Sequence, residues 1–360
     1  MSRPDGDSPP RRAFLAGLGA AGLSGLAGCA GFSLESSNRQ PPLVENRPDG
    51  VYYPTHVEGM QMSGMGSDGA YKCALTYTYP HRFWTITGTN RNTVTVGEDD
   101  SLHLMPVVWH AETGIVTPDV NPNIAVAQDG ERVTEVSPWP MLSQPMGFHF
   151  GDNVQLPGEG SYEITVSVGE PGSRRTGSLA DAGSASFEFS LDYQRSKLDE
   201  LSFTDIPEEK EGTLGAVPAM GMEMVPSTAV PEPDALPGTL RETGTSGDAE
   251  FAVTTLERSA QYGGSESEPY LAVSPRTRYN GYTLPLMSLS ATLERDGETV
   301  YDDVLRATVS PELDIHYGAA VPSVETGDDL TIIIDAPTQA SRHEGYETAF
   351  LEMEPVELTL

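Results

Sequence analysis

The chain has 360 residues, of which 38% are hydrophobic, and a formal net charge of -32 at pH 7. Its length suits two domains that each bury a core, while the acidic balance, with only three lysines, excludes nucleic-acid binding. Because Asp and Glu are spread through segments that alternate apolar and polar residues, we expect a folded protein adapted to high salt. A surface that stores cations is the alternative.

Residues 1–29 have the features of an export signal. Arg11-Arg12 is followed by an Ala-, Gly- and Leu-rich run to Gly28, and paired arginines are typical of the twin-arginine route for folded proteins. Leu26-Ala27-Gly28-Cys29 resembles the lipobox of bacterial and archaeal lipoproteins, which implies a lipid on Cys29. We therefore expect an extracytoplasmic protein anchored by lipid to the cell membrane, with residues 30–47 as a flexible tether.

The sequence pattern of residues 48–197 predicts a first β-domain. Several runs alternate apolar and polar side chains and are rich in β-branched and aromatic residues, which is typical of strands. Outside the signal we find no convincing helical period. Cys73 lies in the first of these runs, where a small buried hydrophobe is expected, and the mature chain has no second cysteine for a disulfide. The runs are Tyr71–Tyr79, Thr93–Val96, Leu102–Val108, Asn123–Ala127, Tyr162–Val168 and Phe187–Tyr193.

An internal repeat predicts a second, related domain. The repeated motifs are separated by 167 positions, as 114 and 281 show, and a constant spacing without gaps indicates duplication. Each unit has Asp-Gly between two strand-like runs, at Asp129-Gly130 and Asp296-Gly297, which predicts type I′ hairpins. The fold class expected is all-β, with two tandem immunoglobulin-like antiparallel β-sandwiches. Residues 198–248, dense in Pro and Gly, are expected to be a linker, and 249–360 the second sandwich. The repeated motifs are Gly114–Pro118 with Gly281–Pro285, Asp129–Val133 with Asp296–Val300, and His149–Gly151 with His316–Gly318.

Histidines and methionines are the candidate metal ligands. His103 and Met105 are two apart in a strand-like run, so both side chains project from one face, and Met141 and His149 follow. Imidazole together with thioether suits copper, because sulfur holds Cu(I) and nitrogen accepts both oxidation states. The alternative is that the methionines fill the core and the histidines are hydrogen-bonded structural groups.

The segment from His103 to Val168 resembles the periplasmic iron-transport family of copper-binding, immunoglobulin-like proteins. The motifs that carry the resemblance are His103-Leu104, Pro140-Met141, Gly147–Val154 and Gly158–Tyr162. It implies a β-sandwich, a copper site of histidines and a methionine, and a role in iron uptake. Carried over by position, the copper ligands would be His103, Met141 and His149.

This sequence departs from the family pattern at Met105, where the family has an acidic residue two positions after the first histidine. A carboxylate there could serve iron, whereas a thioether favours Cu(I). The spacing from Met141 to His149 is also slightly longer than in the family, so Met146 is an alternative ligand.

The second domain lacks most of these ligands. At a spacing of 167 positions, His103, Met105 and Met141 correspond to Tyr270, Ala272 and Thr308, and only His149 keeps a histidine, His316. In the family the working unit is a dimer with its metal site near the subunit interface. The tandem is therefore predicted to form an intramolecular pseudo-dimer in which His343 completes the first-domain site. A solvent-facing histidine in a polar loop is the alternative, and a His343 to His149 separation beyond about 12 Å would contradict the prediction.

Other histidines and methionines are left with open interpretations. His110 is either a supporting residue of the site or merely structural, and His56 and His81 receive no role. Two methionine clusters either capture copper or cover an apolar edge of a sandwich. They are Met60, Met62 and Met65, and Met220, Met222 and Met224.

The chain is not expected to be an enzyme, because the sequence has no nucleophile elbow, zinc-protease motif or phosphate-cradling loop. An electron-transfer cupredoxin is excluded because Cys73 precedes all the candidate ligands. The function predicted is a lipid-anchored, metal-binding protein that supports iron or copper uptake. Copper is the metal expected and iron the second candidate, passed to a membrane permease. The competing hypothesis is a structural or adhesive surface lipoprotein without a metal role.

Overall fold

The computed structural model describes residues 41–360, so the predicted signal, Cys29 and most of the tether lie outside the described residues. Strands dominate this part of the chain, which confirms the all-β prediction. Within it, no helix is long and apolar enough to cross a membrane. Its helical elements are α1 (Arg195–Asp199) and the single-turn 3-10 segments η1 (Gly177–Leu179), η2 (Pro233–Ala235) and η3 (Ala260–Tyr262).

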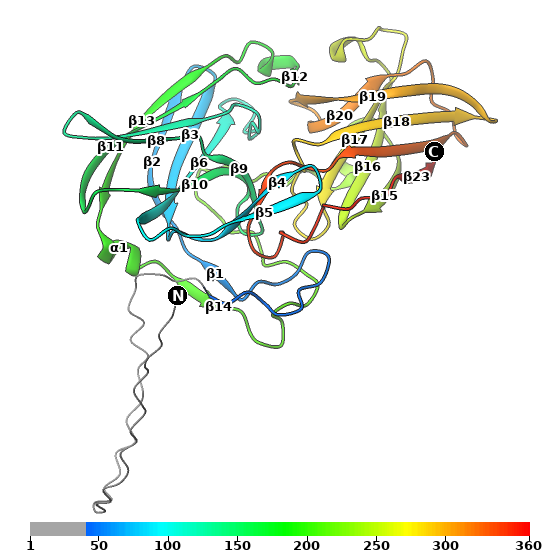
Figure 1. Cartoon of the computed structure of the whole chain (residues 1–360). Helices are drawn as coiled ribbons and strands as arrows, with labels where there is room; N and C mark the ends of the chain where they lie inside the picture. Colours follow the sequence, from blue (N-terminus) through cyan, green and yellow to red (C-terminus); the bar gives the residue numbers. More distant parts are fainter. Residues whose placement is uncertain (1–40) are drawn as a thin grey trace, which may run out of the picture. The chain divides into compact units, whose positions relative to one another are not determined.

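The first half of the described chain builds two sheets that pack face to face (Figure 1). Gly64 and Gly66 lie under Phe189 and Phe187 of the opposite sheet, where a glycine leaves room for a ring. The larger sheet has the order β2 (Gln61–Asp68), β3 (Tyr71–Thr78), β6 (Asp100–His110), β10 (Gly147–Gln155), β9 (Trp139–Ser143), β22 (Ser341–Arg342), β4 (Phe83–Thr87) and β5 (Asn90–Val94). The smaller has the order β13 (Ala185–Tyr193), β11 (Gly160–Val168), β7 (Asn123–Gln128) and β8 (Glu131–Val136).

The second half forms one nine-stranded sheet that curls toward closure. Gly244 and Val356 lie on its two edge strands, and a Cβ on Gly244 would overlap Val356, so these edges meet. The strand order is β15 (Thr239–Ser246), β16 (Ala249–Leu256), β17 (Tyr270–Thr277), β20 (Asp314–Ala320), β19 (Glu298–Ser310), β18 (Ser288–Arg295), β21 (Asp329–Ala336) and β23 (Val356–Thr359), with β12 (Arg174–Arg175) beside β19. A separate pair joins β1 (His56–Glu58) to β14 (Phe203–Asp205).

Both Asp-Gly pairs turn β-hairpins as predicted. Asp129 and Gly130 have φ values of 53° and 78°, and Asp296 and Gly297 have 51° and 81°. Two successive positive φ values define the type I′ turn, which Asp-Gly tolerates because glycine has no Cβ and a short polar residue accepts this conformation. The two hairpins join β7 to β8 and β18 to β19.

The two halves share an order of strands. In the first half, the neighbouring strands are β2, β3, β6 and β10 in that order. In the second half, β15, β16, β17 and β20 are neighbours in the corresponding order. This recurrence is what duplication would produce, but the duplication and the domain boundaries stay predictions. The segment 198–248, expected as a linker, contains β14, η2 and β15, of which β15 is an edge of the nine-stranded sheet.

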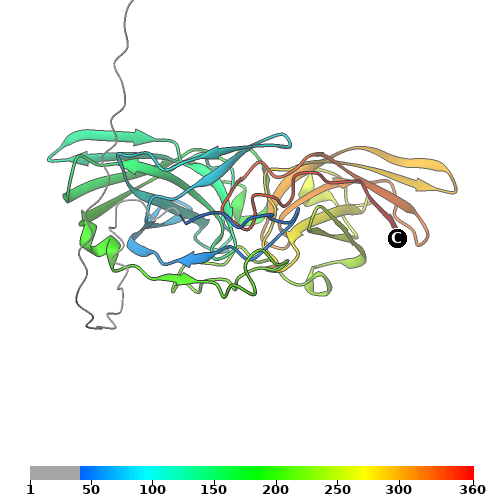
Figure 2. The same ribbon diagram turned by 60° about the horizontal axis from the view of Figure 1, so that its bottom comes forward.

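A short strand from the C-terminal part enters the sheet of the first half. Ser341 and Arg342 of β22 pair in parallel with Met141 and Leu142 of β9, and Arg342 also pairs with Trp84 of β4. In Figures 1 and 2 the red C-terminal segment lies beside the cyan β4 and β5 hairpin. This insertion delivers the residue after Arg342, His343, to the first half.

Candidate metal site

One face of the larger sheet carries the predicted ligands of the first half. His149 of β10 lies directly opposite Met141 of β9, and Asn153 of β10 lies opposite His103 of β6. Since side chains alternate along a strand, His149 and Asn153 point to the same side, and directly opposed partners share that side. His103, Met141 and His149 are all fully buried. Strand register alone therefore gathers these three side chains.

Two further histidines come from loops. His343 follows β22, and its backbone N–H donates to Leu142 O at 3.1 Å. His343 Nε2 lies 3.2 Å from His149 Nε2, which meets the distance that the pseudo-dimer prediction required. His81, in the connection from β3 to β4, has its ring centroid 4.1 Å from that of His103 and 4.8 Å from that of His343. One potential ligand atom from each of His81, His103 and His343 lies within 4.8 Å of the others. We call His81, His103, His149 and His343 the four-histidine cluster.

The hydrogen bonds of three rings turn their Nε2 atoms inward. His149 Nδ1 donates to Gly147 O at 3.1 Å, and His81 Nδ1 donates to Tyr79 O at 3.1 Å. His103 Nδ1 donates a hydrogen bond of 2.8 Å to Asn153 Oδ1. A neutral ring protonated at Nδ1 has its lone pair on Nε2. The Nε2 atoms of His81 and His103 are buried and have no hydrogen-bond partner among the described residues, so each has a lone pair available to a metal ion.

Burial keeps the rings of His103, His149 and His343 neutral. Desolvation lowers the pKa of His103 and of His343 well below the usual range and lowers the pKa of His149 to about 4. A charged imidazolium loses its hydration in such surroundings, which favours the neutral ring. Because a metal binds the unprotonated imidazole, these three rings are in their binding form at neutral pH.

Gly151 makes room at the centre of the arrangement. A Cβ at this position would overlap His103 Nε2 and lie 3.0 Å from Met141 Sδ. Both ligand atoms therefore point into the same space, which the absence of a side chain on Gly151 leaves open. Gly151 lies between His149 and Asn153 on this face of β10, and any larger residue there would collide with His103.

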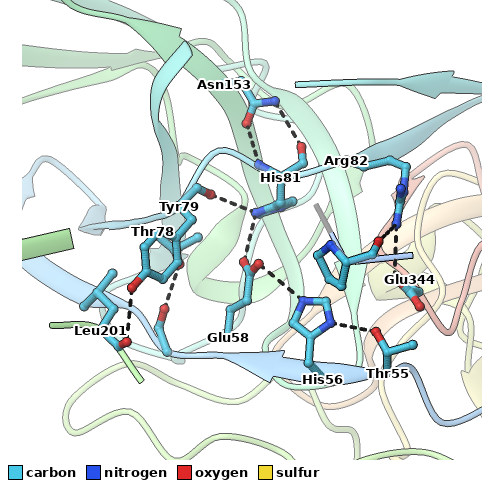
Figure 3. Close-up of polar contacts among 12 residues, drawn as sticks. Thr55, His56, Glu58, Thr78, Tyr79, His81, Arg82, Asn153, Leu201 and Glu344 are labelled. Atoms are coloured by element: carbon cyan, nitrogen blue, oxygen red, sulfur yellow. Dashed lines mark hydrogen bonds and ion pairs between the residues drawn. The ribbon is translucent and has the colours of Figure 1, made fainter. Parts of the chain in front are cut away.

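Polar groups contact His81 on the side away from the other three histidines, and Figure 3 shows them. Glu58 of β1 lies between His56 and His81, with contacts of 3.3 Å to His56 Nε2 and 3.4 Å to His81 Nδ1. Burial alone would raise the pKa of Glu58, but hydrogen bonds from His56 and His81 lower it to about 2. Asn153 bonds the backbone of His81 as well as His103. As an outer partner of both rings, Asn153 fixes their orientation.

The geometry fits a single transition-metal ion. Two atoms bonded to one tetrahedral metal at 2.0–2.1 Å are about 3.3 Å apart, and the His149 to His343 separation is 3.2 Å. The nearby donors are imidazole nitrogens and the Met141 thioether, a set that suits copper better than an ion that prefers oxygen. The residues present therefore fit the group that the sequence motifs imply.

Other predicted candidates lie elsewhere. Met105 and Met146 line a cavity of about 100 Å³ beside the cluster, together with Met60. His110 is seven residues from His103 along β6, a distance of about 23 Å at the rise of a strand, and its Nδ1 bonds Thr113 Oγ1. Met224 of the second methionine cluster is 70% exposed, so it lies on the surface.

His316 shows what becomes of the repeated histidine without the other ligands. It is fully buried, its Nδ1 donates to Asp314 O at 3.0 Å, and Tyr270 Oη lies 3.2 Å from its Nε2. Tyr270 stands where His103 stands in the first unit. A hydroxyl is thus the partner of His316 Nε2, whereas the corresponding Nε2 of His149 faces His343.

Sequence reasoning missed His81 and Glu58. His81 lies in a loop, where no periodicity reports on side-chain direction, and Glu58 lies on a three-residue strand too short for a pattern. The one signal in the sequence was that His81 closely follows the strand run Tyr71–Tyr79. In the structure this run is β3, the neighbour of β6.

The comparisons with known proteins fall on the two halves separately. Residues 109–196 match a family described as Fe2+ transport protein, and residues 234–359 match a domain of unknown function, DUF7350. No curated protein sequence matches the chain.

Among solved structures, two of FetP from a uropathogenic E. coli strain are similar to parts of this chain. The structure as isolated is 18% identical with a TM-score of 0.28, and that of a copper-bound variant is 17% identical with a TM-score of 0.29. Each likeness covers 37% of this chain, and 95% and 97% of the FetP chains. The resemblance predicted from the motifs is confirmed as a match of residues 109–196 to the model of the family described as Fe2+ transport protein.

Proposed function

We propose that this protein is an extracytoplasmic metal-binding protein that supports iron or copper uptake. Copper is the metal proposed, held by His103, Met141, His149 and His343, with His81 as a further imidazole facing the site. The 3.2 Å separation of His149 Nε2 and His343 Nε2 carries this proposal, because the two atoms come from distant parts of the chain. The match of residues 109–196 to an Fe2+ transport family supports it.

The proposed site spans what would be two subunits in a dimer. His103, Met141 and His149 belong to the first half, and the C-terminal part supplies His343 through β22. The tandem would then act as an intramolecular pseudo-dimer, with the second half lending one ligand rather than holding a site of its own. His316, with both ring nitrogens already bonded, agrees with this division of roles.

The chemical role proposed is reversible binding of copper in either oxidation state. Imidazoles accept both states, and a thioether stabilises Cu(I), so the site would accommodate a change of charge without exchanging ligands. A lipid on Cys29 would hold the protein at the membrane surface, next to a permease that accepts metal or electrons. A role beside such a permease agrees with the match to a transport family.

Calorimetric titration with Cu²⁺ and with Cu⁺ tests the proposal. The protein used begins after Cys29 and is kept in high salt, since residues from 38 onward form one compact unit. We expect one equivalent to bind, the His149→Gln variant to lose this binding, and the matched control His110→Gln to keep it. Absence of saturable binding, or binding that does not depend on His149, would instead favour a structural or adhesive lipoprotein.

A further inference from the structure

The four-histidine cluster has a protected side and an accessible side. His103 and His149 are fully buried, and neither lines the adjacent cavity. His81 and His343 both line that cavity of about 100 Å³. A cation that enters through the cavity would therefore meet these two histidines before the buried pair.

The cavity walls contain donors for a cation. They include the carboxylates of Glu58 and Glu344, the His56 imidazole and the thioethers of Met60, Met105 and Met146. Arg82 is the single Lys or Arg in the wall, and its guanidinium lies 3.5 Å from Glu344 Oε2. The charges of Arg82 and Glu344 cancel, so the cavity keeps the negative charge of Glu58. This charge attracts cations.

Glu58 is held loosely enough to exchange partners. Its contacts with His56 and His81 are 3.3 and 3.4 Å long, whereas strong hydrogen bonds between charged groups are about 2.7–2.9 Å. It also lies on the Nδ1 side of His81, while the Nε2 of that ring is the atom without a partner. The His81 ring, whose contact with Glu58 Figure 3 shows, thus lies between the carboxylate and the other three histidines of the cluster.

We propose that this cavity is the entrance for a transition-metal cation, and that Glu58 is a transient ligand that captures the cation before it passes to His81 and the buried histidines. The proposal rests on the metal-binding function proposed above and adds its route of loading. The mixture of carboxylate, imidazole and thioether accepts first-row cations of intermediate hardness as well as Cu(I). The family has an acidic residue at the position of Met105, and in this chain Glu58 of β1 would supply a carboxylate instead.

Stopped-flow mixing with Cu²⁺, followed by tryptophan fluorescence, tests this route in wild type, Glu58→Gln and Glu58→Asp. A capture ligand lowers the barrier in both directions. In Glu58→Gln we therefore expect association and dissociation rate constants both to fall, by about tenfold or more, with Kd and stoichiometry unchanged. Glu58→Asp keeps the charge and is expected to keep most of the rate. The control Asp192→Asn removes one carboxylate charge from an exposed ion pair and should leave both rates as in wild type.

The outcomes separate the possible roles of Glu58. Unchanged rates in Glu58→Gln would overturn the proposal. A weaker Kd with an unchanged association rate would also overturn it, because that pattern belongs to a residue that only orients His81. Failure of the wild-type protein to bind Cu²⁺ would refute the proposed function itself. Equal rates in a wild-type protein and a variant that both bind Cu²⁺ would refute only the role of Glu58.

Discussion

His149 Nε2 and His343 Nε2 lie 3.2 Å apart although 194 residues separate them in the chain. Backbone pairing of β22 with β9 sets this contact, and the buried Arg342 anchors the segment by bonding Ala340 O and Thr338 O. Burial lowers both pKa values, so neither ring is charged, and one neutral ring donates its N–H to the other. The neutral pair is arranged as two ligands of one metal would be.

Shared coordination predicts strong coupling between these two histidines. We expect His149→Gln and His343→Gln each to weaken copper binding by at least about tenfold, and the double variant to be little worse than either single one, because residues that act as a unit are not additive. A double-variant cycle of Kd values measured by competition with a copper chelator checks this. Fully additive losses would show that the two rings bind different ions.

Gly151→Ala is expected to damage the site without removing a ligand. The added methyl group would overlap His103 Nε2 and approach Met141 Sδ, so we expect copper affinity to fall by about tenfold or more. Gly158→Ala is the matched control, since a Cβ there meets nothing within 4 Å. Equal affinities of the two variants would contradict the position assigned to the metal.

Asn153 is expected to matter through the two histidines that it holds. Its side chain accepts from His103 and donates to the His81 carbonyl. Loss of such an outer partner typically costs 10–100-fold in metal affinity, and we expect a loss of about that size in Asn153→Ala. Asn92→Ala, on the exposed edge strand β5, serves as the comparison. The same Kd for both would refute the orienting role.

Acid should destabilise the metal-free protein. The pKa values of His149 and His316 are each lowered to about 4 in the folded state, mainly by burial, so at pH values between 4 and 6.5 the unfolded chain binds more protons. Unfolding free energy therefore rises with pH in this window and is lost as pH falls through it. We expect a loss of about 2 kcal/mol for each of these histidines between pH 7 and pH 4.5. Urea unfolding at several pH values measures it, and a flat profile would contradict neutral burial.

Local patterns predicted the parts of the fold that depend on local physics. The run Tyr71–Tyr79 coincides with β3, and Asp-Gly forms the turns expected, because alternation and turn conformation are properties of a few adjacent residues. The run Thr93–Val96 was placed too late: β5 is Asn90–Val94, an exposed edge strand whose polar residues show no alternation. β22 is two residues long and pairs only through tertiary contacts, so no pattern could reveal it.

The same limit applies to the candidate site. His103, Met141 and His149 were predicted from a motif, and strand register places them on one face. His343 was predicted only through the dimer that the family resemblance implies. His81 and Glu58 depend on how a loop and a short strand pack against the sheet, which sequence periodicity does not report.

The central claim is that one copper ion binds between the two halves of the chain. Diffraction from copper-loaded crystals, recorded at the copper absorption edge, tests it most directly. We predict a single strong anomalous peak within bonding distance of the Nε2 atoms of His103, His149 and His343 and of Met141 Sδ. An empty cluster in crystals whose copper peaks lie only at surface carboxylates would contradict the account.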